Sequence, residues 1–162
     1  MYPIKLSYDN VFQWRKPTDV AVINNRIGKT TKEIHTPAEL MTIAEKIALE
    51  GHSFCPATFK DGKRSKDGFV QQQFLALDFD NKAPNPKVTF EEVRQRAEKY
   101  GLSILFAYDT FSSANHNKFR VIFLNDVPIT DRVVAEAVML ALGTIFPEAD
   151  PSCYRDVSRL YF

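Results

Sequence analysis

This sequence has no long apolar run, no closely spaced pair of cysteines and almost no net charge. Its two cysteines, Cys55 and Cys153, lie far apart and outside any Cys-x-x-Cys motif, so we expect reduced, packed thiols and no structural zinc site. No apolar run approaches the roughly 18 residues of a membrane span. The N-terminus also lacks a signal-peptide pattern. These absences predict a cytoplasmic protein without a membrane partner.

The composition is that of a folded protein, with 44% hydrophobic and 25% charged residues among 162. This length suits one domain, or one domain with a small appendage. The net charge of +1 hides an asymmetry between the two parts of the chain. Residues 1–68 carry 11 Lys and Arg against 8 Asp and Glu, whereas residues 69–162 carry 10 against 12. The first part is therefore mildly basic, and the second carries the excess of acids.

The stretch Phe74-Leu-Ala-Leu-Asp-Phe-Asp80 places two carboxylates on one face of a predicted strand. Successive side chains of a strand alternate between its faces, so Asp78 and Asp80 share a face roughly 6.6 Å apart along the backbone. Their oxygens can converge on one or two divalent ions. Neighbouring carboxylates repel each other without a cation, which favours a metal site. A strand end that enters a polar turn at 80–82 is the plainer interpretation.

Capping residues and hydrophobic periodicity predict the elements around this stretch. Helices are predicted from Thr36 to Gly51, from Thr89 to Gly101, and from Thr130 or Asp131 to Pro147. A turn is predicted at 83–86. Strands are predicted over 4–8, 20–23, 54–59, 74–80, 102–108, 119–124 and 157–162.

From residue 74 onward, the order strand, helix, strand, strand, helix, strand is that of the split β-α-β, or ferredoxin-like, unit of an α+β fold. We expect the strands at 74–80 and 119–124 to be central and parallel, with the strand at 157–162 antiparallel beside the first. Helices cover the face opposite Asp78 and Asp80. The segment before the last strand then brings a third carboxylate, Asp150, close to these two.

Three motifs of this unit resemble those of the archaeo-eukaryotic primase superfamily. Leu77-Asp-Phe-Asp80 is similar to its Asp-x-Asp motif, the polar hairpin at 112–120 to its Ser-x-His motif, and Asp150 to its hydrophobic-Asp motif. Here Ser113-Ala-Asn-His116 has one residue more than Ser-x-His. The surrounding sequence is similar to primase-polymerase domains in replication proteins of phages and mobile elements. The resemblance extends over residues 70–162 but covers little of residues 1–68.

The resemblance implies an RRM-like catalytic core that performs metal-dependent nucleotidyl transfer on a single-stranded DNA template. It assigns catalysis and the ligation of Mg²⁺ or Mn²⁺ to Asp78, Asp80 and Asp150. The residues it assigns to binding an NTP or dNTP are Ser112 or Ser113, His116, Arg120 and Arg159. The basic loop at 60–68 offers further candidates for DNA or phosphate contact: Lys60, Lys63, Arg64 and Lys66.

Residues 1–68 are expected to form a small N-terminal α/β lobe packed on the active-site face of the core at 69–162. One compact domain is the alternative. Because related replication proteins often continue into a helicase, the chain is also interpreted as a piece of a longer protein. Its expected partners are then a helicase domain or another replication protein.

Two other functions stay open at this point. A non-catalytic, RRM-like nucleic-acid-binding module would stack bases on sheet aromatics, but carboxylates on the open face repel phosphate unless a metal joins them. A hydrolase of the haloacid dehalogenase type also has Asp-x-Asp after an apolar strand, but the later strand-strand hairpin does not suit that fold. Single residues have plainer roles too. His116 can be a solvated loop residue, Arg120 an ion-pair partner of Asp78 or Asp80, and Arg159 part of a local charge cluster.

Overall fold

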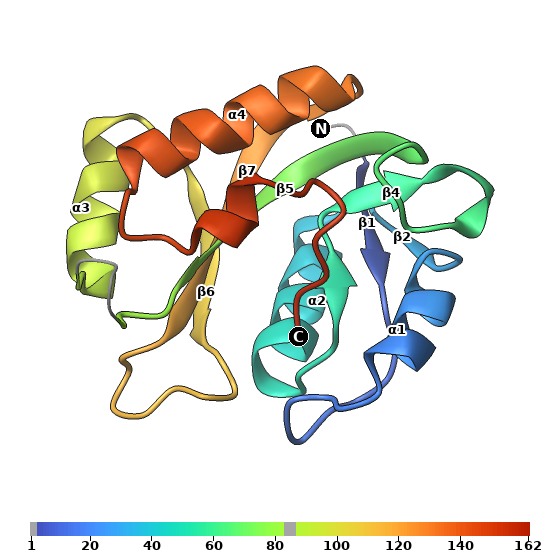
Figure 1. Cartoon of the computed structure of the whole chain (residues 1–162), viewed down its shortest axis with the longest axis horizontal. Coiled ribbons are helices and arrows are strands. Elements are labelled where there is room, and N and C mark those ends of the chain that lie inside the picture. Colours follow the sequence, from blue (N-terminus) through green and yellow to red (C-terminus); the bar gives the residue numbers. More distant parts are fainter. Residues whose placement is uncertain (1–2, 83–86) are drawn as a thin grey trace.

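The computed structural model describes residues 3–82 and 87–162 as a mixed α and β structure with two antiparallel sheets (Figure 1). The α+β class is thereby confirmed, while the predicted turn at 83–86 lies outside the described residues. The elements are β1 (Ile4–Tyr8), α1 (Val20–Ile27), β2 (Thr31–Ile34), α2 (Pro37–Leu49), β3 (Phe54–Cys55), β4 (Ala57–Phe59), η1 (Lys60–Gly62), β5 (Phe69–Phe79), α3 (Phe90–Lys99), β6 (Ile104–Asp109), β7 (Phe119–Ile129), α4 (Arg132–Ile145) and η2 (Pro151–Tyr154).

The larger sheet has the strand order β4-β5-β7-β6, with β5 and β7 at its centre. These two strands are antiparallel, and Phe79 pairs with Phe119, so the prediction of parallel central strands is wrong. The reason is the hairpin between β6 and β7. Helix α3 connects β5 to β6, and β7 then returns between these strands, opposite in direction to both. The 110–118 loop consequently lies at the end of the sheet where β5 ends.

The strand predicted at 157–162 is also wrong, because this segment forms only an isolated bridge between Tyr161 and Phe54. The place beside β5 is taken by β4. Pro56 explains why the segment at 54–59 is not one strand, since a proline has no N–H to donate to a strand ladder. It divides the strand predicted at 54–59 into β3, which pairs with β1, and β4, which pairs with β5. The chain thus passes from the smaller sheet, ordered β2-β1-β3, to the larger one at Pro56.

Helix caps account for most of the helix boundaries. Thr36 accepts a hydrogen bond from the Glu39 N–H, Thr89 forms a capping box with Glu92, and Asp131 caps α4. The strand predicted at 20–23 is wrong because this segment begins helix α1. Asp19 accepts a hydrogen bond from Val22 N at 3.2 Å, and the buried Ile23 and Ile27 lie one helical turn apart.

One hydrophobic cluster includes residues of both sheets, such as Leu6 of β1 and Leu77 of β5. Figure 1 shows α3 and α4 on one side of the larger sheet, and α1, α2 and the smaller sheet on the other. On this second side the Tyr161 hydroxyl donates to the Ala76 carbonyl at 2.9 Å. The division of the chain at residues 68 and 69 stays a prediction.

Within the described ranges, none of the helices has both the length and the apolar character needed to cross a membrane. The cytoplasmic location expected from the sequence stays a prediction.

Candidate functional site

A cavity of about 330 Å³ lies where the end of β5 meets the C-terminal segment and the 110–118 loop. We call it the carboxylate cavity. It gathers six of the twelve site residues expected from the sequence, and these come from separate parts of the chain. The predicted residues in its lining are Asp78, Asp80, Ser112, Arg120, Asp150 and Arg159, joined by Lys16, Thr110, Phe111, Leu160 and Phe162.

A row of three polar side chains crosses the larger sheet at the base of this cavity. The strand register sets Asp78 opposite Arg120, and Arg120 opposite Tyr108, so all three share one face. Arg120 Nε donates to Asp78 Oδ1 at 2.5 Å and Nη2 to Oδ2 at 3.3 Å, while Nη1 donates to the Tyr108 hydroxyl at 2.6 Å. Asp78 and Arg120 are only 7% and 5% exposed. The charge of Asp78 is therefore balanced within the protein.

Electrostatics keep Arg120 charged in this row. Burial disfavours the guanidinium, but Tyr108 and Asp78 outweigh that effect and raise the pKa of Arg120 above its ordinary value. Burial also raises the pKa of Tyr108, so its hydroxyl stays protonated at neutral pH. The row thus holds a fixed positive charge beside a carboxylate.

Arg159 connects Asp78 to the third carboxylate of the cavity. Its Nη2 lies 3.2 Å from Asp78 Oδ2 and 3.4 Å from Asp150 Oδ2. The backbone also links the acids, because Asp150 N donates to the Asp78 carbonyl at 2.8 Å. Burial opposes ionisation of Asp150, but hydrogen bonds from Ser152 and the charge of Arg159 lower the pKa of Asp150 overall. The structure therefore brings Asp150 to the end of β5, although the last strand on which that prediction rests does not form.

The acids differ in how well they fit a divalent cation. Both oxygens of Asp78 accept hydrogen bonds from arginines, whereas among the described residues Asp80 pairs only with the exposed Lys82, at 3.2 Å. In the described parts of the chain, no three His, Cys, Asp or Glu side chains are grouped closely enough to hold a metal by themselves. Mg²⁺ commonly takes one or two carboxylates together with substrate phosphates. Asp80 and Asp150 both line the cavity, whereas Asp78 is already engaged by Arg120 and Arg159.

The structure does not bring His116 and Ser113 into the carboxylate cavity. The His116 side chain is 88% exposed, and its Nδ1 lies 2.5 Å from Asp109 Oδ2. Ser113 Oγ donates to the other oxygen of the same carboxylate at 3.2 Å. Of the loop residues expected to bind a nucleotide, only Ser112 lines the cavity. A nucleotide contact by His116 or Ser113 stays a prediction.

The basic loop at 60–68 also lies outside the cavity lining, and two of its cations contact other parts of the chain. Arg64 donates to the Asn24 side chain at 3.1 Å and to the Ser158 carbonyl. Lys66 donates to the Arg155 carbonyl at 3.0 Å. These bonds fasten the loop to α1 and to the C-terminal segment. Lys60 and Lys63 do not line the carboxylate cavity, and their contact with DNA stays a prediction.

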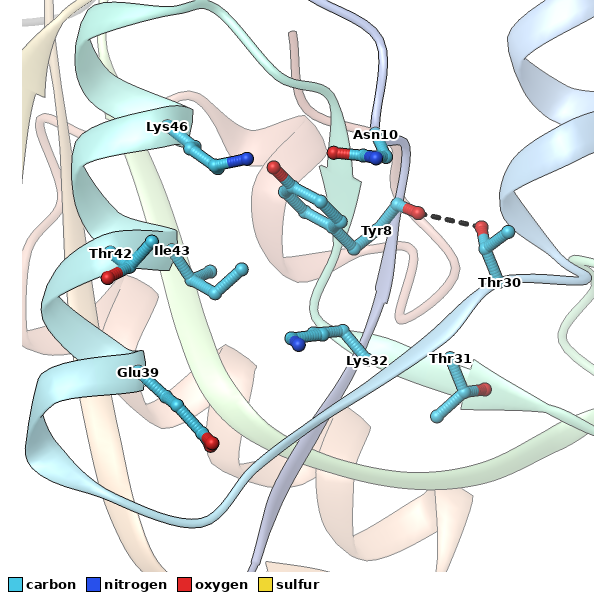
Figure 2. Close-up of a pocket in the computed structure, with 9 residues that line it drawn as sticks. All are labelled: Tyr8, Asn10, Thr30, Thr31, Lys32, Glu39, Thr42, Ile43 and Lys46. Atoms are coloured by element: carbon cyan, nitrogen blue, oxygen red, sulfur yellow. Dashed lines mark hydrogen bonds between the residues drawn. The ribbon is translucent and has the colours of Figure 1, made fainter.

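A second cavity, of about 420 Å³, lies between the smaller sheet and α2. Figure 2 shows Tyr8, Lys32 and Lys46 directed into it, with the Thr30 hydroxyl donating to the Tyr8 carbonyl. The Tyr8 hydroxyl lies 2.9 Å from His52 Nδ1. Glu39 is the single carboxylate of its lining. This cavity lacks the grouped acids of the first.

Sequence reasoning missed several lining residues of the carboxylate cavity. Lys16 follows Phe12, Trp14 and Arg15, and this grouping of aromatic and basic residues could have drawn attention to it. Thr110 and Phe111 are adjacent to the motif at 112–120. Leu160 and Phe162 give no signal in the sequence, because their position depends on how the C-terminal segment packs.

No protein-family model, curated protein or solved structure matches this chain.

Proposed function

We propose that the chain is the catalytic domain of a DNA primase-polymerase, which binds an NTP or dNTP in the carboxylate cavity and joins it to a strand on a single-stranded DNA template. The observation that supports this function best is the convergence of three acids and two arginines on one cavity. These side chains are Asp78, Asp80, Arg120, Asp150 and Arg159. Such a group of opposite charges suits a triphosphate together with the cations that accompany it.

The arrangement of the larger sheet supports an RRM-like core of this superfamily. Strands β5 and β6 are joined through α3, and β7 lies between them before the chain enters α4. This is the order expected of a split β-α-β unit. The acids lie at the end of β5, where the resemblance assigns the catalytic motif. The use of β4 as the strand beside β5 is a variation at the edge of the sheet.

The residues of the cavity have distinct parts in the proposed reaction. Arg120 is buried with Asp78 and Tyr108, so it holds the base of the cavity in position. Arg159 is more exposed: its Nη1 donates to Ser152 Oγ, while its Nη2 makes longer contacts with Asp78 and Asp150, at 3.2 and 3.4 Å. We infer that Nη2 is the part of this guanidinium that turns to a phosphate. Asp80 and Asp150 would hold Mg²⁺ or Mn²⁺. Such an ion supplies charge to stabilise the leaving pyrophosphate.

A non-catalytic nucleic-acid-binding module is the second candidate, and one observation favours it. The pairing of Asp78 with Arg120 and Arg159 removes negative charge that would otherwise repel phosphate. Bases cannot stack on the sheet face in such a module, however, because other parts of the chain cover that face. Tyr161 lies against Ala76 on that face, and the α2 residue Ile47 shares a cavity lining with Tyr108.

The decisive experiment is primer synthesis and primer extension on single-stranded DNA, with Mg²⁺ or Mn²⁺, by the wild type and by the variants Asp80→Asn and Asp150→Asn. We expect each variant to lose about 100-fold or more of the rate, as when one transition-state contact is removed. Asp126→Asn, an exposed acid of β7 outside the cavity lining, is the matched control and keeps the wild-type rate.

Two outcomes would contradict the proposal. One is a metal-dependent rate that neither substitution lowers. The other is no product with either metal while single-stranded DNA still binds, which would favour the non-catalytic module.

A further inference from the structure

The connection between β1 and α1 exposes large aromatic side chains. Trp14 is 72% exposed and Phe12 is 57% exposed. We call residues 11–16, Val-Phe-Gln-Trp-Arg-Lys, the aromatic–basic loop. Burial of a large apolar side chain stabilises a fold, so a chain that leaves two aromatic rings in water forgoes that stabilisation. Grouped exposed aromatics of this kind mark interaction surfaces.

The backbone of this loop is held in place although its rings are free. Gln13 N donates to the Glu50 carbonyl at 3.0 Å, just beyond the end of α2. On the N-terminal side, the buried Asp9 accepts two hydrogen bonds from Arg26, at 2.9 and 2.6 Å. The loop is therefore anchored at one end and in its middle. Its rings point outward from a fixed support, so a ligand that binds them loses little conformational entropy of the backbone.

The aromatic–basic loop borders the carboxylate cavity. Lys16 lines that cavity, and so does Phe111 of the 110–118 loop. The two loops meet over Gly51, where an added Cβ would lie 2.3 Å from the Gln13 carbonyl oxygen and 2.5 Å from Cζ of Phe111. Figure 1 shows both loops at the lower edge of the molecule. The loop that carries the exposed rings thus reaches the cavity through Lys16.

The chemistry of the loop selects its ligand. Every nucleobase has a π-face that can stack on Trp or Phe, and the neighbouring phosphates attract Arg and Lys. The Arg15 guanidinium lies 4.6 Å from the centre of the Trp14 ring, so a positive charge and an aromatic ring lie side by side. We propose that the aromatic–basic loop binds the single-stranded template at the entrance of the carboxylate cavity, with a base stacked on Trp14 and phosphates on Arg15 and Lys16. This inference rests on the proposed function for the identity of the strand as a template.

The test uses the fact that Trp14 is the single tryptophan of the chain. Its fluorescence is titrated with an oligothymidylate in the presence of EDTA and without nucleotide, so that binding is measured apart from catalysis. We expect saturable quenching. In parallel, anisotropy of a labelled oligothymidylate is expected to show at least about 5-fold weaker binding by Trp14→Ala, and near-normal binding by Trp14→Phe, which keeps a stacking ring.

Tyr100→Ala is the matched control, because Tyr100 is an exposed aromatic at the end of α3 and does not line the cavity. It is expected to bind the oligonucleotide as the wild type does. Arg15→Gln is expected to lower the slope of log K against log salt by about 0.7, the value for one lost phosphate contact on a single strand. Unchanged fluorescence on saturation with DNA, or equal affinities of Trp14→Ala and wild type, would overturn the inference. Quenching by anionic vesicles alone would overturn it too, and would assign the loop to a lipid surface.

The two proposals fail separately in these experiments. If Asp80→Asn abolishes extension but Trp14→Ala binds and extends the template normally, the loop inference fails and the proposed function stands. If no nucleotide is transferred but DNA still quenches Trp14 and Trp14→Ala still weakens binding, the loop inference stands as strand binding and the proposed function fails.

Discussion

Arg120 is the residue on which the geometry of the candidate site depends most. It contacts Asp78, Tyr108 and the Phe162 carbonyl, and its guanidinium lies 4.6 Å from the centre of the Tyr161 ring. One buried cation thus joins β5, β6, β7 and the C-terminal segment. Loss of activity on replacing Asp78 therefore cannot separate a catalytic role from a structural one, and Asp80 and Asp150 are the cleaner probes.

We expect Arg120→Met to lower the free energy of unfolding by about 3–5 kcal/mol, because it leaves the Asp78 carboxylate buried without its main partner. The double variant Asp78→Asn/Arg120→Met should recover part of this loss, since it removes the unpaired charge. Urea denaturation of the single and double variants measures both effects. Arg132→Met, which breaks an exposed pair with Glu136, is the control and should cost under about 1 kcal/mol. A similarly small loss for Arg120→Met would contradict this account of the pair.

At the residue scale, the sequence predicts positions that follow from strand alternation and chain order. The expected proximity of Asp150 to Asp78 is present, but it arises from the segment between α4 and η2 and not from a last strand beside β5. The conformation of the 110–118 loop follows from neither rule, and its hydrogen bonds to Asp109 turn His116 away from the cavity. The pairing of Asp78 with Arg120 was foreseen only as an alternative, because it depends on the register of β5 and β7.

At the scale of elements, one ion pair ties α3 to the segment that delivers Asp150. Arg96 of α3 donates to both oxygens of Glu148, at 2.7 and 2.9 Å, and to the Ile145 carbonyl at 3.1 Å. Its guanidinium also lies 5.7 Å from the centre of the Phe146 ring. The path of the chain from α4 to η2 is therefore fixed by a contact outside the carboxylate cavity.

Glu148→Gln is expected to lower the free energy of unfolding at pH 7 by about 1.5–3 kcal/mol, the usual worth of hydrogen bonds to a charged group. The hydrogen bonds from Arg96 lower the pKa of Glu148 below 4.5 in the folded protein. A lowered pKa means that the stabilisation is complete above pH 4.5 and is lost as the pH falls through the folded-state value. Urea unfolding at pH 7 and pH 3 should show the difference between variant and wild type shrinking at the lower pH. An equal difference at both values would exclude this ion pair as its source.

Helix prediction succeeded where caps are explicit, as at Thr36, Thr89 and Asp131. It failed for strands whose pairing is decided by distant segments. Val20, Val22 and Ile23 of α1 have high strand propensity, but the Asp19 cap and the burial of Ile23 favour a helix. The segment at 157–162 has a strand-like composition but finds the edge of β5 already paired with β4.

At the scale of the whole molecule, both thiols lie in the interior. Cys55 is fully buried, and Cys153 accepts a hydrogen bond from Asp78 N at 3.3 Å. Burial raises the pKa of each thiol to about 12. At pH 8 the reactive thiolate is therefore nearly absent in the folded protein.

We expect an aromatic disulfide reagent at pH 8 to label neither cysteine of the folded protein within minutes, and to label both after denaturation in urea. The absorbance of the released thiol gives the count. Serine variants, Cys55→Ser and Cys153→Ser, identify which thiol reacts. Rapid labelling of either cysteine while circular dichroism shows an intact fold would contradict the burial of that thiol.

The sequence resemblance includes little of residues 1–68, which are expected to form a separate lobe; the structure adds that hydrophobic residues of the two parts belong to one cluster. The sequence does not reveal this shared core because apolar residues on β1 and on β5 have the same pattern whether they face each other or separate partners.

The passage of the chain between the sheets at Pro56 has a mechanical consequence. Only Pro56 separates β3 from β4, and the proline ring fixes its own φ near −65°. A swivel of one sheet against the other would need backbone freedom that this junction does not have. The second attachment, between Phe54 and Tyr161, resists the same rotation. The two sheets that border the two cavities are therefore joined at Pro56 without a flexible linker.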